Sequence, residues 1–151
     1  MSEKIILLIE DNPDDEELTR LALQANNIVN RVVVAHDGVE ALDYLFATGP
    51  YAGCDPSALP ELILLDLKLP KIDGLEVLRR LRSYNRTKLL PVVVLTSSNE
   101  EQDLLASYSL GANSYVRKPV DFAQFTEAVR QLGLYWLVVN QSPPRGAFGV
   151  S

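Results

Sequence analysis

The sequence has little of several features that mark other classes of protein. Only one of its 151 residues is cysteine, so an internal disulfide is impossible and a reducing cytoplasm is the expected compartment. The apolar run at 5–9 is too short to cross a bilayer or to serve as a signal sequence, and no other transmembrane candidate is found. A formal net charge of −6 argues against nucleic acid or an anionic membrane as the main partner.

Two isolated reactive residues do not suggest a site of their own. The only histidine, His36, has no second histidine or cysteine at ligand spacing, so we expect a structural role for it. Cys54 lies among small residues without a nearby base, and is not expected to act as a nucleophile. The composition, 47% hydrophobic and 23% charged, is that of a single soluble globular domain.

Short apolar runs alternate with helical patterns along the whole chain. The first helix is expected to begin at Pro13 with Asn12 as its cap, and the fourth to end at Gly111. Strands and intervening helices in strict alternation predict an α/β fold, a doubly wound five-stranded parallel sheet flanked by five helices. The expected strands are 5–9, 32–35, 62–65, 92–95 and 114–117.

The spacing of apolar residues predicts which face of each helix is buried. In the first helix the expected buried stripe is Leu18, Leu21, Ala22 and Ala25. The third helix is expected to point Leu75, Leu78 and Leu81 inward, and Arg79, Arg80 and Arg82 outward. The fifth is expected to carry Phe122, Phe125, Val129 and Leu132 on one face, and the glycine- and proline-rich segment 48–60 is expected to be a surface loop.

Polar residues of complementary chemistry end four of the predicted strands. Glu10 and Asp11 follow the first strand, Asp66 the third, Thr96 the fourth and Lys118 the fifth. Parallel strands bring these residues to one edge of the sheet, where crowded carboxylates would repel one another unless a cation such as Mg²⁺ bound them. A lysine and a hydroxyl suit phosphate oxygens. The set predicts an acyl-phosphate site in which Asp66 accepts a phosphoryl group.

Each of these residues, taken alone, has a simpler interpretation. Glu10 and Asp11 could be helix-start charges, Asp66 a turn residue, Thr96 a helix cap, and Lys118 a solvated loop lysine. Their occurrence together at four strand ends, in the required chain order, favours a single site.

Four motifs together closely resemble the receiver domain of two-component response regulators. They are Glu10-Asp11-Asn12, the run 65–70 followed by Asp73-Gly74, Thr96-Ser97, and Tyr115-Val116-Arg117-Lys118-Pro119. The resemblance implies that Asp66 is the phosphoacceptor, and that Glu10, Asp11, Asp66 and the backbone carbonyl of Lys68 arrange the Mg²⁺ shell. It also implies that Thr96 and Lys118 contact the phosphoryl group and that Tyr115 is an aromatic switch coupled to Thr96. The bond before Pro119 would be cis, and the sheet would have the flavodoxin-like strand order 2-1-3-4-5.

Finer details are similar to the stand-alone regulators that serve bacterial phytochromes. These details are the acidic start at 10–15, the long loop before the third strand and the apolar end of the fifth helix. The implied phosphoryl donor is a sensor histidine kinase, such as a phytochrome. We expect a receiver domain over 1–140 and a flexible tail over 141–151 without an output domain, so that output passes through protein contacts.

An apolar run near the end of the sequence predicts a homodimer. It contains Tyr135, Trp136, Leu137, Val138 and Val139, a surface that a monomer of this size would struggle to cover. The interface would also include the exposed side of the strand around Tyr115. The alternative is that the long loop or the tail folds over the run.

Lys68 distinguishes this chain from a rival enzyme class. Haloacid-dehalogenase-type phosphohydrolases also form an aspartyl phosphate, but place a second aspartate two residues after the nucleophile, where this chain has Lys68. A non-enzymatic regulator is therefore favoured, and a phosphorylation-independent interaction module is the other alternative. In receiver domains this position and that of Ser98 influence hydrolysis of the aspartyl phosphate. One hypothesis is that Lys68 crowds the attacking water, and the alternative is that it points away into solvent.

Overall fold

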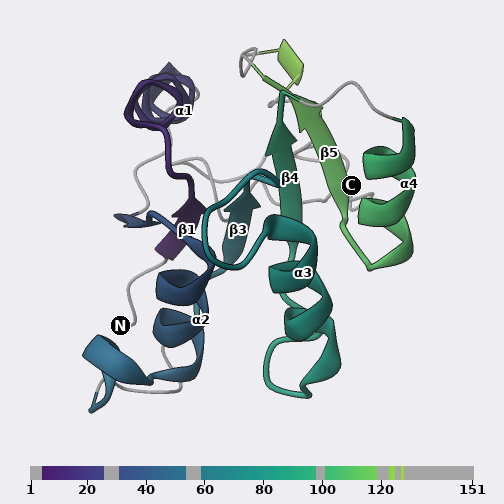
Figure 1. Cartoon of the computed structure of the whole chain (residues 1–151). Helices are drawn as coiled ribbons and strands as arrows, with labels where there is room; N and C mark the ends of the chain where they lie inside the picture. The colour runs from purple at the N-terminus through teal and green to yellow at the C-terminus, as the bar shows by residue number, and fades with distance from the viewer. Residues whose placement is uncertain are drawn as a thin grey trace, which may run out of the picture.

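The structure, a computed structural model, is built on a five-stranded parallel sheet of order β2-β1-β3-β4-β5. It describes residues 5–25, 31–53, 59–97 and 101–118, with Ala123, Gln124 and Glu127. The strands are β1 (Ile5–Ile9), β2 (Arg31–Ala35), β3 (Leu62–Leu65), β4 (Val92–Thr96) and β5 (Ser114–Arg117). The helices are α1 (Pro13–Ala25), α2 (Gly38–Phe46), the short 3-10 helix η1 (Gly49–Tyr51), α3 (Gly74–Ser83) and α4 (Glu101–Ser109). The predicted fold class and strand order are confirmed (Figure 1).

Several predictions fall on residues outside the described ranges. The fifth helix is described only at Ala123, Gln124 and Glu127, which are helical. Cys54, Ser98, Pro119, the apolar run 135–139 and the tail 141–151 lie outside the described residues. Within the described ranges, none of the helices is long and apolar enough to cross a membrane.

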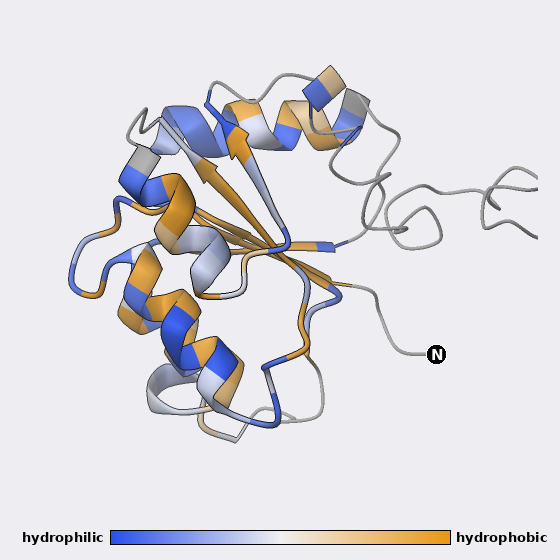
Figure 2. Ribbon diagram, turned by 90° about the vertical axis from the view of Figure 1, so that its right-hand side faces the viewer, coloured by the Kyte–Doolittle hydropathy of each residue, from blue (hydrophilic) through white to orange (hydrophobic). Residues whose placement is uncertain are grey.

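Both faces of the sheet are buried, which explains why its strands are apolar without alternation. Leu7 and Ile9 of β1 pack into a core with the apolar residues of α2 and α3. Ile6 and Leu8 point to the opposite face, where they share a second core with Leu23 of α1. In Figure 2 the hydrophobic strands lie between the helices, and Figure 1 shows α1 set apart from α2 and α3. Helices on both faces leave the carboxyl ends of the strands free to carry a site.

The buried face of α1 differs from the predicted stripe. Leu18 and Leu21 are 44% and 50% exposed, whereas Thr19, Ala22 and Leu23 are buried. Apolar spacing admits two overlapping stripes here, with Ala22 in both. The observed one continues towards Asp15, whose carboxylate is tied to the sheet by an ion pair described below. The helix start is as predicted, since the Asn12 side chain accepts hydrogen bonds from the next turn's backbone (2.8 and 3.1 Å).

Arg82 is not the outward-facing arginine that the helical pattern predicted. Its guanidinium donates to the backbone oxygens of Gly111 (2.8 Å), Leu90 (2.8 Å) and Lys88 (3.0 Å), and to the side chain of Asn113 (3.0 Å). These acceptors lie in loops that follow α3 and α4. A planar fork of donors can satisfy several such carbonyls at once. Arg82 therefore fastens the end of α3 to both loops.

The other two arginines of α3 reach solvent as predicted, Arg79 being exposed and Arg80 partly exposed. Arg79 and Arg80 both pair with Glu76 one turn earlier (2.5 and 2.8 Å). Such pairs on a helix surface contribute little to stability because water screens them.

Candidate functional site

The backbone at the carboxyl edge of the sheet is fixed by hydrogen bonds that extend beyond the strands. The amide of Glu10 donates to the last residue of β2 (2.9 Å), and that of Asp66 to the last residue of β1 (3.0 Å). The amide of Lys118 donates to the carbonyl of Thr96 (2.8 Å). Glu10, Asp66 and Lys118 therefore each occupy a place set by the neighbouring strand.

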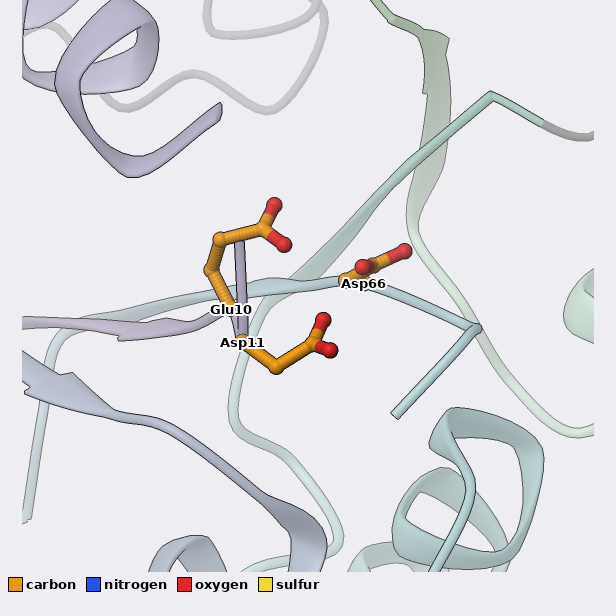
Figure 3. A group of neighbouring side chains, drawn as sticks. All are labelled: Glu10, Asp11 and Asp66. Carbon is orange, nitrogen blue, oxygen red and sulfur yellow. The ribbon is translucent and has the colours of Figure 1, made fainter. Parts of the chain in front are cut away.

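Three carboxylates meet at this edge, and we call Glu10, Asp11 and Asp66 the acidic cluster. An oxygen from each lies within 4.8 Å of an oxygen of both others. Figure 3 shows their side chains around a common space, and they come from the ends of β1 and β3. Glu10 and Asp66 are 1% and 5% exposed, while Asp11 is exposed to solvent. The juxtaposition predicted from the strand ends is present.

The ammonium of Lys118 lies against this cluster. Its Nζ contacts Glu10 Oε1, and lies 3.2 Å from Asp66 Oδ2 and 3.0 Å from Asp15 Oδ2. The lysine side chain is only 6% exposed. Asp15 was missed by the sequence analysis, because an acidic residue in the first turn of a helix is explained by the helix dipole alone. Its position one turn after Asp11 was the only available signal.

Burial and charge change the protonation behaviour of these groups. Burial raises the pKa of Glu10 from 4.5 to about 7, and the negative charge of Asp66 adds to the rise, although the hydrogen bond from Lys118 opposes it. Burial alone would lower the pKa of Lys118, but the hydrogen bond to Glu10 and the charge of Asp66 outweigh burial and raise it. Lys118 therefore remains a cation, as a contact for phosphate oxygens requires.

The loop after β3 holds the carboxylate of Asp66. The backbone N–H of Lys68 donates to Asp66 Oδ1 (3.2 Å), and that of Gly74 donates to the carbonyl of Leu67 (2.9 Å). Asp73 caps α3 by accepting from the backbone of Glu76 (2.9 Å). The loop between Asp66 and α3 is therefore closed by main-chain and capping bonds.

The Lys68 side chain leans towards α4. Its Nζ lies 3.4 Å from Asp103 Oδ2, and the side chain remains 63% exposed. Asp11, Lys68 and Asp103 help to line a cavity of about 420 Å³ beside the acidic cluster. A molecule that approaches the cluster from this side passes the Lys68 side chain.

Thr96 and Tyr115 lie on the two adjacent strands β4 and β5. Thr96 is fully buried at the last position of β4. Tyr115 pairs in register with Val94 and packs, half-buried, against the core on the α2 and α3 face. Thr96 itself pairs in register with Arg117, so the two residues lie on neighbouring strands two register positions apart.

The donor set of the acidic cluster suits a hard divalent cation. Carboxylate oxygens are the ligands that Mg²⁺, Mn²⁺ and Ca²⁺ prefer, and three of them converge here without a cysteine or histidine. Burial, and after it the negative charge of Asp66, raises the pKa of Glu10, and a bound cation would favour the charged form of this carboxylate.

Comparison with known proteins identifies relatives over nearly the whole chain. Residues 6–130 match the family model described as the response regulator receiver domain. The solved structure of the bacteriophytochrome response regulator AtBRR is 52% identical, with a TM-score of 0.81, and the match covers 93% of this chain and all of that one.

Two cyanobacterial regulators are also similar. Response regulator Rcp1 from Synechocystis is 39% identical over 134 residues, 89% of either chain. The crystal structure of its Mn²⁺-bound form has a TM-score of 0.74 at 37% identity, covering 93% of this chain and 99% of that one. The phosphorylated phytochrome response regulator RcpA is 40% identical with a TM-score of 0.74, over 95% and 99% of the two chains.

Proposed function

This chain belongs to the response regulator receiver family of two-component signalling, and on that premise we propose that Asp66 is its phosphoacceptor. The observation that carries the proposal is the position of Asp66 itself. Asp66 is buried beside two further carboxylates, and a buried lysine lies 3.2 Å from its Oδ2. A carboxylate in this setting has a cation ready for an incoming phosphate and an acidic cluster that can hold a metal ion.

The proposed reaction is transfer of a phosphoryl group from a phosphohistidine of a sensor kinase. A carboxylate oxygen of Asp66 forms a bond to phosphorus while the bond from phosphorus to the imidazole nitrogen breaks. The nitrogen keeps the electron pair of the broken bond, and the released imidazole is free to take a proton from water. Lys118 and the hydroxyl of Thr96 are proposed to bind phosphoryl oxygens and so to stabilise the negative charge on them during transfer.

Glu10, Asp11, Asp66 and the backbone carbonyl of Lys68 are the proposed ligands of Mg²⁺. The bound cation would supply positive charge that offsets the charge of the acidic cluster and of the phosphate. The Mn²⁺-bound form of Rcp1 supports a divalent ion in this family, and the oxygen-only donor set of the cluster supports Mg²⁺ in this chain.

The proposed output is a change of surface rather than a chemical product. Phosphorylation adds about −1.5 to −2 charges, and Thr96 would move towards them while Tyr115 enters the space it leaves. We include in the proposal a homodimer through the strand around Tyr115 and the apolar residues Tyr135, Trp136 and Val138. Those last residues lie outside the described ranges, so their support comes from the sequence.

The proposed donor is a phytochrome histidine kinase in the cytoplasm. Its support is that AtBRR, at 52% identity, is a bacteriophytochrome response regulator and that RcpA is a phytochrome response regulator. Receiver domains are signalling proteins, and the proposal assigns this chain no catalytic turnover of its own and no nucleic-acid partner.

A small-molecule donor tests the proposal directly. The protein is incubated with Mg²⁺ and acetyl phosphate, and the intact mass is measured over time. We expect a single stable phosphoryl adduct, lost in Asp66→Asn and in the presence of EDTA. Rapid release of inorganic phosphate without an adduct would indicate a phosphohydrolase, and a folded protein that is never phosphorylated would indicate an interaction module.

The donor is tested separately, by phosphotransfer from a panel of purified histidine kinases that includes bacterial phytochromes. Fast transfer from a phytochrome to the wild type, and none to Asp66→Asn, is the expected result. Equal rates from unrelated kinases would remove the support for a phytochrome partner.

A further inference from the structure

Lys118 lies between carboxylates from three different elements. Glu10 follows β1, Asp66 follows β3, and Asp15 belongs to the first turn of α1. Its Nζ contacts Glu10, and lies 3.2 Å from Asp66 and 3.0 Å from Asp15. Two of these three partners belong to the acidic cluster, and Asp15 does not.

The ammonium and a divalent cation require the same oxygen atoms. When Glu10 and Asp66 bind a divalent cation, their charge is largely neutralised and the cation repels Lys118. Lys118 is only 6% exposed, and a buried ammonium that loses its partners without reaching water is costly. The contact that remains available is the one with Asp15.

We propose that Asp15 is a positioning residue, which holds the Lys118 ammonium when the acidic cluster binds a divalent cation. This inference rests on the proposed function, because it concerns the same metal and the same lysine. Asp15 is suited to the role because its own element, α1, is anchored by the Asn12 cap and by Leu23 in the core. Its side chain is 31% exposed, so its carboxylate stays in contact with water whether or not the cluster binds a cation. Asp15 thereby favours metal binding, although it binds no metal itself.

The neighbouring Asp14 provides a matched control. It lies in the same first turn, its backbone is held by the same Asn12 oxygen, and its side chain is exposed. Asp14→Asn and Asp15→Asn therefore remove the same charge from the same end of the same helix. Of these two aspartates, only Asp15 has an ion pair to Lys118 among the contacts of the described residues.

In the experiment, each metal-free variant is titrated with Mg²⁺ in an isothermal titration calorimeter, which measures its affinity for the ion. We expect Asp15→Asn to weaken Mg²⁺ binding about fivefold, at the low end for coupled sites because a partly exposed carboxylate is screened by water. Asp14→Asn is expected to stay within about twofold of the wild type, and so is Asp15→Glu, which retains the charge. Thermal unfolding of each variant establishes that it is folded.

A double-mutant cycle with Lys118→Met distinguishes an effect of Asp15 through Lys118 from a direct electrostatic effect of the Asp15 charge on the bound Mg²⁺. If Asp15 acts through Lys118, the effect of Asp15→Asn must shrink to less than about twofold in the Lys118→Met background. An equal loss in both backgrounds, or an equal loss in Asp14→Asn, overturns the inference. If the wild type and Asp15→Asn bind Mg²⁺ with equal affinity, this inference alone is overturned. Wild-type protein that binds no Mg²⁺ overturns the metal assignment of the proposed function as well.

Discussion

A Cβ atom on Gly74 would lie 2.3 Å from the carbonyl oxygen of Asp66 and 2.6 Å from the Cα of Leu67. The first residue of α3 thus packs directly on the backbone that carries the proposed phosphoacceptor. No side-chain rotation can relieve this contact, because the atoms that a methyl group would meet belong to the main chain.

Gly74→Ala is therefore expected to displace the Asp66 loop. We predict a loss of about 2 kcal/mol in the free energy of unfolding, typical of overpacking, together with weaker Mg²⁺ binding. Urea denaturation and calorimetry measure the two effects. Ser83→Ala at the exposed far end of α3 is the control. A variant with wild-type stability and Mg²⁺ affinity would show that the loop adapts without cost.

Arg82→Ala is expected to destabilise the fold without touching the site. The substitution leaves the carbonyls of Gly111, Leu90 and Lys88 without their donor, and we predict a loss of about 2–3 kcal/mol. Arg79→Ala on the same helix, where the arginine is exposed and pairs with Glu76, should leave the urea midpoint unchanged. Equal urea midpoints for the two variants would contradict the stabilising role that we assign to the hydrogen bonds of Arg82.

Lys68→Ala tests whether this side chain protects the phosphorylated protein. If Lys68 crowds the attacking water, its removal should speed dephosphorylation about threefold, a small factor because the side chain is exposed. The rate is followed by intact mass after the phosphodonor is removed. An unchanged or slower rate in the variant would rule the idea out.

Asp103→Ala gives the complementary test. Asp103 holds the Lys68 ammonium at 3.4 Å from its Oδ2, so its removal frees Lys68 to lie over the phosphoryl group. We expect slower dephosphorylation than in the wild type, and no difference between Lys68→Ala and the double variant.

The raised pKa of Glu10 predicts a pH dependence of stability in metal-free protein. In the folded state the pKa of Glu10 is about 7, whereas its ordinary value, which applies to the unfolded chain, is 4.5. Between these two pH values the folded state therefore holds more protons than the unfolded state. The free energy of unfolding must therefore fall as pH rises through this window, by about 3 kcal/mol. Urea denaturation with EDTA from pH 4.5 to 8 measures it. In Glu10→Gln the free energy of unfolding should no longer fall through this pH window. Parallel plots of this free energy against pH for the wild type and the variant would contradict the raised pKa of Glu10.

The sheet and the strand-end residues could be predicted because their determinants are local. An apolar run ended by a polar residue marks a buried parallel strand, and the parallel arrangement alone brings Glu10, Asp66 and Lys118 to one edge. The contacts of Lys118 with Glu10 and Asp66 agree with that reasoning.

The remaining features depend on partners that are distant in sequence. The acceptors of Arg82 near Gly111 are 29 residues away, and the spacing within α3 holds no information about them. The buried face of α1 includes Thr19 rather than Leu18, because tertiary packing and the pair between Asp15 and Lys118 select between two possible stripes. For the same reason Asp15 resembled an ordinary helix-start charge.

The backbone hydrogen bonds that fix the site also make its formation depend on complete folding of the sheet. Asp66 is held by β1, Glu10 by β2, and Lys118 by β4, so the proposed acceptor and its cations come together only after all five strands have paired. A partly folded chain would have the same residues but would lack the arrangement that we propose accepts the phosphoryl group. Signal input is thereby confined to molecules whose sheet is already assembled, and a misfolded copy would consume no phosphoryl group from its kinase.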